Sequence, residues 1–308
     1  MNISLQYHLG KTQEHLDFID VKLDTDNLLF IDPRLIEAMG KSSKLYTNMQ
    51  LNIEAFWGEL IKSIKLKDAA LMNRLLSGLS EPNETRLGYA FSKHTGNSIG
   101  KKLKPKLIKA IISNKAVKTG ILSHFSDVEL FIEDISCDRV SDITTKIIKS
   151  ALIGFTQEQC NLLKIPMAKL KQKDIFNHLT FKWEIQEVEL PIDDYGKAVI
   201  FVPKEIVRLE NSATSNISCF YRYAIRKFIK HDKDMLKDIS GSGKNKEIQL
   251  CDIKSEFPLS KESLTEWTHR FPKLLVDYKT DHMNVRLKPL TTEQIERIVY
   301  SDIYKQVG

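Results

Sequence analysis

The sequence predicts a mixed α/β protein in which helices pack on a small mixed sheet and the C-terminal part is mainly helical. Three observations predict this class. Short segments alternate apolar and polar residues, as strands do. Longer segments repeat apolar residues every three or four positions, as helices do, and strand patterns are scarce beyond residue 246. We expect an α/β body over residues 1–210 and a C-terminal region over 211–308 that contains a flexible linker near 239–246.

The N-terminal third combines a hairpin with three helices. Residues 15–31 alternate around an Asp-Thr-Asp-Asn turn, which predicts a β-hairpin. Pro33 suits the first turn of a helix, and Gly40 suits a helix end. The spacing of apolar residues predicts helices over residues 34–39, 44–65 and 68–76.

The remaining chain alternates between the two patterns. A weak alternation over residues 128–135 predicts a strand, and strands at 181–190 and 198–202 are expected to form a second hairpin. Ser141 can cap a long helix that follows it. Helices are expected over residues 101–113, 142–163, 216–238 and 291–304.

The sequence points to a cytoplasmic protein without a membrane partner. No apolar stretch approaches the ~20 residues of a spanning helix, and the N-terminus lacks the pattern of a secretory signal. The four cysteines, Cys137, Cys160, Cys219 and Cys251, have no zinc-binding spacing. They are expected to be reduced thiols.

Charge is distributed unevenly along a chain whose net charge is +6. Eight lysines and no acid lie between Lys93 and Lys118, and six acids with one arginine lie between Asp127 and Asp142. This contrast suggests an anionic partner for one segment and a cation for the other. The alternative is two solvated surfaces, which is the usual fate of charged side chains.

The lysine-rich segment offers a candidate phosphate-binding site. Gly96 and Gly100 precede a helix that begins with Lys101, Lys102 and Lys104. A helix N-terminus presents free N–H groups and partial positive charge, and glycines let a phosphate approach closely. The alternative is a plain loop followed by a solvated helix face.

The acidic segment offers candidate metal ligands and catalytic carboxylates. On a strand, Asp127 and Glu133 share one side, while Asp138 and Asp142 lie at the start of the following helix. Carboxylates gathered at a strand end suit Mg²⁺. We expect metal ligands among Asp127, Glu133 and Asp138, and catalytic roles among Glu133, Asp138 and Asp142. The alternative is helix capping together with surface charge.

Four further residues are weaker candidates. Asp32 and Lys204 each end an apolar segment, a position where α/β proteins often place working residues. Glu81 and Glu84 directly precede the glycine-containing loop. Capping explains Asp32 equally well, and a surface position explains Lys204.

A basic and aromatic segment follows residue 216. Arg222 and Arg226 interleave there with aromatic residues, a mixture that suits single-stranded nucleic acid. Helical spacing favours another interpretation, in which Phe220, Tyr223 and Phe228 belong to the core.

Five segments along the chain carry a resemblance: residues 30–34 (FIDPR), 81–88 (EPNETRLG), 138–145 (DRVSDITT), 202–207 (VPKEIV) and 271–275 (FPKLL). They resemble segments of a family of hypothetical bacterial proteins encoded near restriction and phage-defence genes. These pieces span most of the chain. The resemblance implies a genomic context of antiviral defence and favours a role directed at nucleic acid.

The combined observations favour a bacterial defence protein that is a Mg²⁺-dependent nuclease. The acids would hold the metal and an attacking water, and the lysines would hold the phosphodiester backbone of DNA or RNA. Gln186 stands where a restriction-type motif has lysine, which is a departure from that pattern. Two alternatives remain: a non-enzymatic module that binds nucleic acid or a partner such as an ATPase or helicase encoded nearby, and an enzyme acting on a nucleotide or NAD-like molecule.

Overall fold

The computed structural model describes residues 1–25, 27–40, 42–89, 110–133, 135–210 and 217–301. The chain divides into two compact units, neither of which is a continuous segment. The first unit contains residues 1–109, 136–210 and 288–308, and the second contains residues 110–135 and 211–287.

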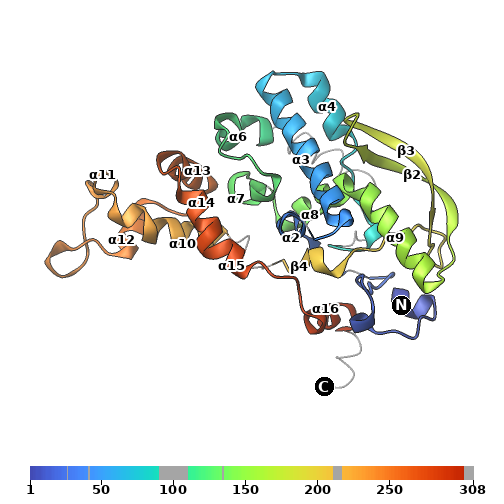
Figure 1. The fold of residues 1–308 in the computed structure, drawn as a ribbon. Helices are drawn as coiled ribbons and strands as arrows, with labels where there is room; N and C mark the ends of the chain where they lie inside the picture. Colours follow the sequence, from blue (N-terminus) through green and yellow to red (C-terminus); the bar gives the residue numbers. More distant parts are fainter. Residues whose placement is uncertain (26, 41, 90–109, 134, 211–216, 302–308) are drawn as a thin grey trace. The chain divides into compact units, whose positions relative to one another are not determined.

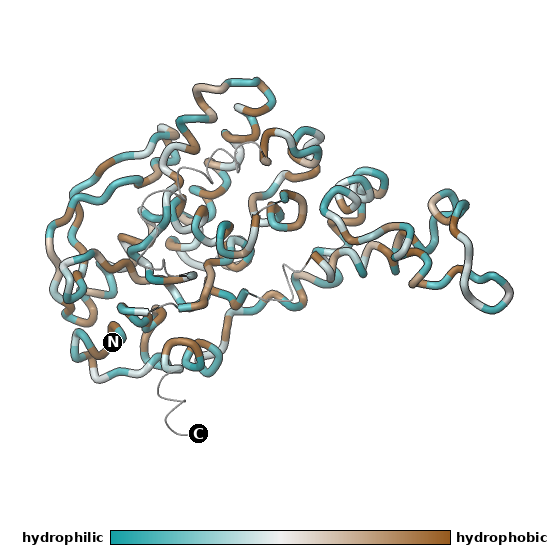
Figure 2. The backbone as a smooth tube through the Cα atoms, turned by 180° about the vertical axis from the view of Figure 1, so that it is seen from behind, coloured by the Kyte–Doolittle hydropathy of each residue, from teal (hydrophilic) through white to brown (hydrophobic). Residues whose placement is uncertain are grey.

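The first unit is mixed α/β, as expected, and carries both small antiparallel sheets, β1–β4 and β2–β3 (Figure 1). Hydrophobic residues are interspersed among hydrophilic ones along the β2–β3 hairpin (Figure 2), of which the sequence predicted only the strand β3. The strands of the first unit are β1 (Phe30–Ile31), β2 (Ala168–Asn177), β3 (Lys182–Leu190) and β4 (Val207–Arg208). Its helices are α1 (Ile3–Gln6), α2 (Pro33–Met39), α3 (Lys44–Lys65), α4 (Ala69–Ser77), α8 (Cys137–Ile147), α9 (Lys149–Leu163) and α16 (Thr292–Val299).

In the described residues of the second unit, all regular secondary structure is helical. Helix α10 lies against α7, α13 and α14, and these helices form its core. The helices are α6 (Lys115–Thr119), α7 (Val128–Phe131), α10 (Ile217–Lys227), α11 (Lys233–Leu236), α12 (Leu250–Glu256), α13 (Lys261–Arg270), α14 (Leu274–Tyr278) and α15 (Asn284–Arg286), with a π-helical turn at Lys279–Met283.

Local signals located helices α2, α3 and α4 correctly, whereas α1 was not predicted. Asp32, Ser43 and Asp68 each accept a backbone N–H from the first turn of the helix that follows, so they are N-caps of α2, α3 and α4. Helix α3 covers the expected residues 44–65, and its apolar face is buried. Capping and periodicity depend on residues a few positions apart, which is why the sequence alone was sufficient here.

Strand pairing differs from the prediction. Strand β3 matches the expected strand at 181–190, but it pairs with β2, whereas 198–202 forms no strand. The backbone around 198–202 bonds to several different segments: Ile200 donates to the carbonyl of Glu84, and Val202 accepts from Ile19. Alternation of hydrophobic and polar residues indicates that one side of a strand is buried, but it does not identify the strand with which it pairs.

Two further predicted strand elements are wrong. Residues 15–31 form no hairpin. Most of their apolar residues are buried, although Leu28 is exposed, and the strand β1 at their end pairs with β4. Residues 128–135 begin with helix α7, because Val128 and Phe131 bury one helical face. The expected helix 142–163 is two helices, α8 and α9, which meet at Ile148.

The aromatic residues of α10 belong to the core of the second unit, as helical spacing predicted. Phe220 is fully buried, with its ring centroid 6.0 Å from Phe131 and 4.7 Å from Tyr278. Tyr223 is also buried. The expected helix 216–238 ends early, at Lys227, and a separate short helix α11 follows.

Helix α16 is anchored to the N-terminal segment of the first unit. Ile295 and Val299 are fully buried. The Val299 carbonyl accepts a hydrogen bond from the Asn2 side chain at 3.2 Å, and the Tyr300 hydroxyl donates to Asp20 at 2.8 Å. In the described part of the chain, no helix has the length and apolar content needed to span a membrane.

Because of these contacts, we expect truncation of Ile295 to destabilise the first unit. Ile295→Ala removes a fully buried side chain and should lower the free energy of unfolding by about 2–4 kcal/mol. Arg297→Ala on the exposed side of α16 loses only an ion pair with Glu293, worth about 0.3–0.5 kcal/mol. Urea unfolding of both variants measures the difference, and equal values would show that α16 does not contribute to the core.

Candidate functional site

Helix α8 carries two of the predicted acids on one face. Asp138 and Asp142 are four residues apart, which places them one above the other on a helix. The helix begins at Cys137, five residues before the expected start, so Ser141 and Asp142 lie inside it. Ser141 instead accepts a hydrogen bond from the Ile31 N–H at 2.9 Å. A capping role therefore does not account for Asp142.

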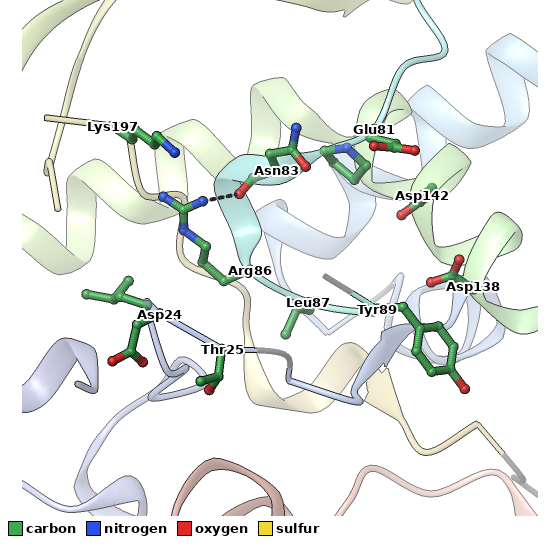
Figure 3. A pocket seen from close by; sticks show the side chains of 12 residues that line it. Asp24, Thr25, Glu81, Asn83, Arg86, Leu87, Tyr89, Asp138, Asp142 and Lys197 are labelled. Carbon is green, nitrogen blue, oxygen red and sulfur yellow. Dashed lines mark hydrogen bonds between the residues drawn. The ribbon is translucent and has the colours of Figure 1, made fainter. Parts of the chain in front are cut away.

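The loop after α4 places Glu81 beside these two acids. Figure 3 shows the side chains of Glu81, Asp142 and Asp138 succeeding one another along one wall of a pocket of 420 Å³. Arg86 and Lys197 line the same pocket. Glu81 was a weaker candidate in the sequence, and the structure brings it together with the two stronger ones.

The loop itself is held by buried polar contacts. The Asn27 side chain donates to the carbonyl of Arg86 at 2.9 Å, and Gly88 donates to the Asn27 carbonyl at 2.9 Å. The Arg86 guanidinium pairs with the buried Asp193 at 2.7 Å. Gly88 has a φ of +84°, and a Cβ built there would lie 2.8 Å from Asp138 Oδ1. Glycine at this position therefore permits the close approach of the loop to α8.

Burial raises the pKa of all three carboxyl groups, and neighbouring acids of the pocket add to the shift for Glu81 and Asp142. Burial and the Asp138 charge raise the pKa of Glu81. Burial, with the charges of Asp138 and Glu81, raises the pKa of Asp142 to about 8. Burial also raises the pKa of Asp138, although a hydrogen bond from the Tyr89 N–H opposes it. A bound cation would relieve this repulsion, because it stabilises the ionised forms.

A second pocket, also 420 Å³, adjoins the first, and cations outnumber carboxylates in its lining by five to three, so we call it the basic pocket. The two pockets share Glu81, Asn83, Arg86 and Lys197. The second adds Lys146 from α8 and Lys171 and Lys173 from β2. A groove with carboxylates at one end and ammonium groups at the other can hold a metal beside a phosphate.

Two buried lysines connect α8 and α9 to this basic pocket. Lys149 Nζ lies 2.6 Å from Glu84 and donates to the Lys173 carbonyl at 3.1 Å. Burial raises the pKa of Glu84, but the pairing with Lys149 outweighs burial, so the net shift is downward. Burial and the Lys149 charge lower the pKa of Lys146, which lies 3.6 Å from Asp174.

Asp127 and Glu133 belong to the second unit and line neither pocket. Asp127 is buried and pairs with Lys279 at 2.6 Å, which indicates a structural role. Glu133 is exposed just after α7. The prediction that they share one side of a strand is wrong, because residues 125–131 are helical.

The other candidate residues either have structural partners or lie outside the residues that the structure describes. Asp32 caps α2 and lies 3.4 Å from Arg208, fully buried. Lys204 donates to the Leu16 carbonyl at 2.7 Å. The expected phosphate-binding residues lie outside the described residues: Gly96, Gly100, Lys101, Lys102 and Lys104.

Sequence reasoning missed Arg86, Lys146 and Lys197. Lys146 had a local signal, since it follows Asp142 by four residues on the same helix. Arg86 had a weaker one, in the loop that also carries Glu81. Lys197 had none, because its position depends on how the loop before residue 198 folds back onto the first unit.

The residue types fit Mg²⁺, although the described residues contain no group of three or more His, Cys, Asp or Glu side chains close enough to enclose a metal ion. Mg²⁺ is commonly held by one or two carboxylates, with water and substrate phosphate oxygens completing its coordination. The Asp142 carboxylate has no hydrogen bond or ion pair with any described residue, so it is available as such a ligand.

The fold and the pockets define a mixed α/β protein with an acidic pocket that adjoins a basic one. Residues 8–215 match the model of the family described as Domain of unknown function (DUF8370), and the chain belongs to this family. The matched region contains all residues that line the two pockets. Searches of curated proteins and of solved structures find no significant match.

The raised pKa of Asp142 has a consequence for stability. Its value is about 8 in the folded state and about 4 in the unfolded chain. The stability from the protonated form is therefore complete below about pH 4 and is lost as the pH rises to about 8. Asp142→Asn imitates the protonated acid and should raise the free energy of unfolding at pH 8 by roughly 1–3 kcal/mol, with no change near pH 4.

Denaturant unfolding at the two pH values measures this effect. A matched control is Asp194→Asn, because Asp194 is exposed on a turn outside the pocket. If Asp142→Asn destabilised the protein equally at both pH values, the carboxylate would have a structural role in α8.

The close approach at Gly88 can be tested separately. Gly88→Ala and Gly196→Ala both place a side chain at positive φ, but only the first meets an atom within 4 Å. Each should lose about 1 kcal/mol from backbone strain. The collision with Asp138 should cost Gly88→Ala roughly 1 kcal/mol more. Equal losses in thermal unfolding would show that the loop can move away from α8.

Proposed function

We propose that this chain is a Mg²⁺-dependent nuclease that hydrolyses phosphodiester bonds. One observation carries the proposal: Glu81, Asp138 and Asp142 line one pocket, which shares Arg86 and Lys197 with an adjoining basic pocket. Besides burial, the charge of Asp138 raises the pKa of both Glu81 and Asp142 there. Phosphodiester hydrolysis needs both a metal held by acids and positively charged side chains, because charge develops on the phosphoryl oxygens and on the leaving oxygen.

The roles follow from position. Asp138 and Asp142, with Glu81, would hold the metal, which lowers the pKa of a bound water and polarises the phosphoryl group. Arg86 and Lys197 lie between the two pockets, where they would orient the scissile phosphate and stabilise its charge. Lys171 and Lys173 would hold the neighbouring phosphates of the strand.

Metal binding should depend on pH. Asp142, with a pKa of about 8, is largely protonated at neutral pH and must lose its proton to become a ligand. Activity is therefore expected to rise between about pH 7 and pH 8.

The resemblance of five segments to proteins of phage-defence neighbourhoods supports an antiviral role for this cleavage. Such a role would restrict the activity to infection, which suits an effector regulated by a partner such as an ATPase or helicase.

A non-enzymatic binding module is the second candidate. The observation that favours it is the pairing of Glu84 with Lys149 and of Asp193 with Arg86, which leaves much of the charge around the groove internally balanced. In that case the exposed lysines of β2 would bind nucleic acid and the acids would have no catalytic role.

Carboxylate variants distinguish the two candidates. With labelled DNA and RNA strands and Mg²⁺ or Mn²⁺, Glu81→Gln, Asp138→Asn and Asp142→Asn should each reduce cleavage at least about 100-fold. EDTA should abolish cleavage by the unaltered protein. Asp194→Asn, which removes an exposed carboxylate outside both pockets, should cleave normally.

Binding measured in EDTA serves as the companion readout. Variants that bind normally but do not cleave support the nuclease. Cleavage that persists in all three variants would contradict the assigned site. Binding without cleavage in any divalent cation would support the binding module.

A further inference from the structure

The second unit contains a basic hollow of 640 Å³ that lies outside the residues matched by the family model. Helix α10 provides Arg222, Arg226 and Lys227 on one side, and α15 provides Arg286 on the other. All four side chains are exposed. The hollow therefore gathers four permanent positive charges from segments about sixty residues apart in the sequence.

Little in the hollow neutralises these charges. Asp281 is the single carboxylate among its lining residues, and it accepts a hydrogen bond from the Tyr223 hydroxyl at 2.7 Å. Arg226, Lys227 and Arg286 have no hydrogen bond or ion pair with any described residue. An anion entering the hollow would meet donors that are not already engaged.

Buried aromatic residues lie next to the cationic side chains of α10. Tyr223, next to Arg222, is buried, and the neighbouring Phe220 and Tyr278 are fully buried. Arg222 is itself oriented, because its Nε donates to the Ser218 carbonyl at 3.2 Å and Nη2 lies 3.3 Å from Cys219 Sγ. The packed core thus fixes the positions from which α10 presents its cations.

An aromatic ring lies among the cations. His282 lines the hollow and is partly exposed, and its ring centroid is 5.6 Å from Tyr278 and 6.4 Å from Tyr223. Guanidinium planes and aromatic rings are the surfaces on which unpaired bases stack.

We propose that this hollow binds the sugar-phosphate backbone of a single-stranded nucleic acid. Guanidinium groups form paired hydrogen bonds with phosphate oxygens, and Arg222, Arg226 and Arg286 provide three of them around one space. A duplex presents its bases already stacked and paired, so the partly exposed ring of His282 would have no base to contact. The choice of a nucleic acid as the ligand rests on the proposed function of the first unit. The inference that the hollow binds an anion is independent of that function.

The test uses the full-length protein and fluorescently labelled oligothymidylate and oligouridylate in EDTA. The triple variant Arg222→Gln, Arg226→Gln and Arg286→Gln should bind at least about tenfold more weakly, and its log–log salt dependence should flatten by about 0.7 for each lost phosphate contact. The control is Lys233→Gln, Lys237→Gln and Lys254→Gln, which removes the same charge from exposed positions of the second unit that do not line the hollow. It should bind nearly as the unaltered protein does.

Three outcomes would overturn the proposal: unchanged affinity in the arginine variant, an equal loss in the lysine control, and tighter binding of duplex than of single strands that depends on the same arginines. Binding of free adenosine nucleotides or inorganic phosphate, in place of oligonucleotides, would also overturn it. Cleavage of a small phosphodiester such as bis(p-nitrophenyl) phosphate separates the two proposals. It should survive in the arginine variant and be lost in Asp142→Asn, so failure of one proposal is distinguishable from failure of the other.

Discussion

The placement of helix α8 is the constraint on which the candidate site depends. Its buried residues pack beneath the pocket, and Ser141 ties the helix to strand β1 through the Ile31 N–H. With the helix fixed in this way, Asp138, Asp142 and Lys146 follow one another along its pocket-facing side. The acidic and basic halves of the groove therefore share one rigid element, and their separation is set by the helical rise.

The ionised carboxyl groups of α8 lower the free energy of unfolding of the protein when no cation is bound. Partly buried carboxyl groups close to one another cost free energy when they ionise, which is why the pKa of Asp142 reaches about 8. Ion pairs elsewhere in the groove are well satisfied, as Glu84 with Lys149 shows. Strain of this kind, confined to one end of a pocket, is typical of sites that become stable when they bind a cation.

The two units present different chemistry to a ligand. The first combines carboxylates with lysines in adjoining pockets, whereas four cations and one carboxylate are among the residues that line the described hollow of the second. The nuclease that we propose would use both kinds of surface, because contacts to backbone phosphates position a strand and a separate group of residues cleaves it. Helix α10 would serve the positioning, since its apolar face is buried in the core of the second unit and its arginines line the hollow.

The sequence by itself determined the features that depend on near neighbours in the chain. The capping role of Asp32, the length of α3 and the core role of Phe220 all arise from residues within a turn or two. It also identified Asp138, Asp142 and Glu81 as candidates. Only the tertiary structure decided that β3 pairs with β2 and that Asp127 forms an ion pair with Lys279. It also decided that Arg86 and Lys197 line the same pocket as the acids of α8. These outcomes depend on contacts between distant segments, and local periodicity records that a residue is buried without specifying which segment covers it.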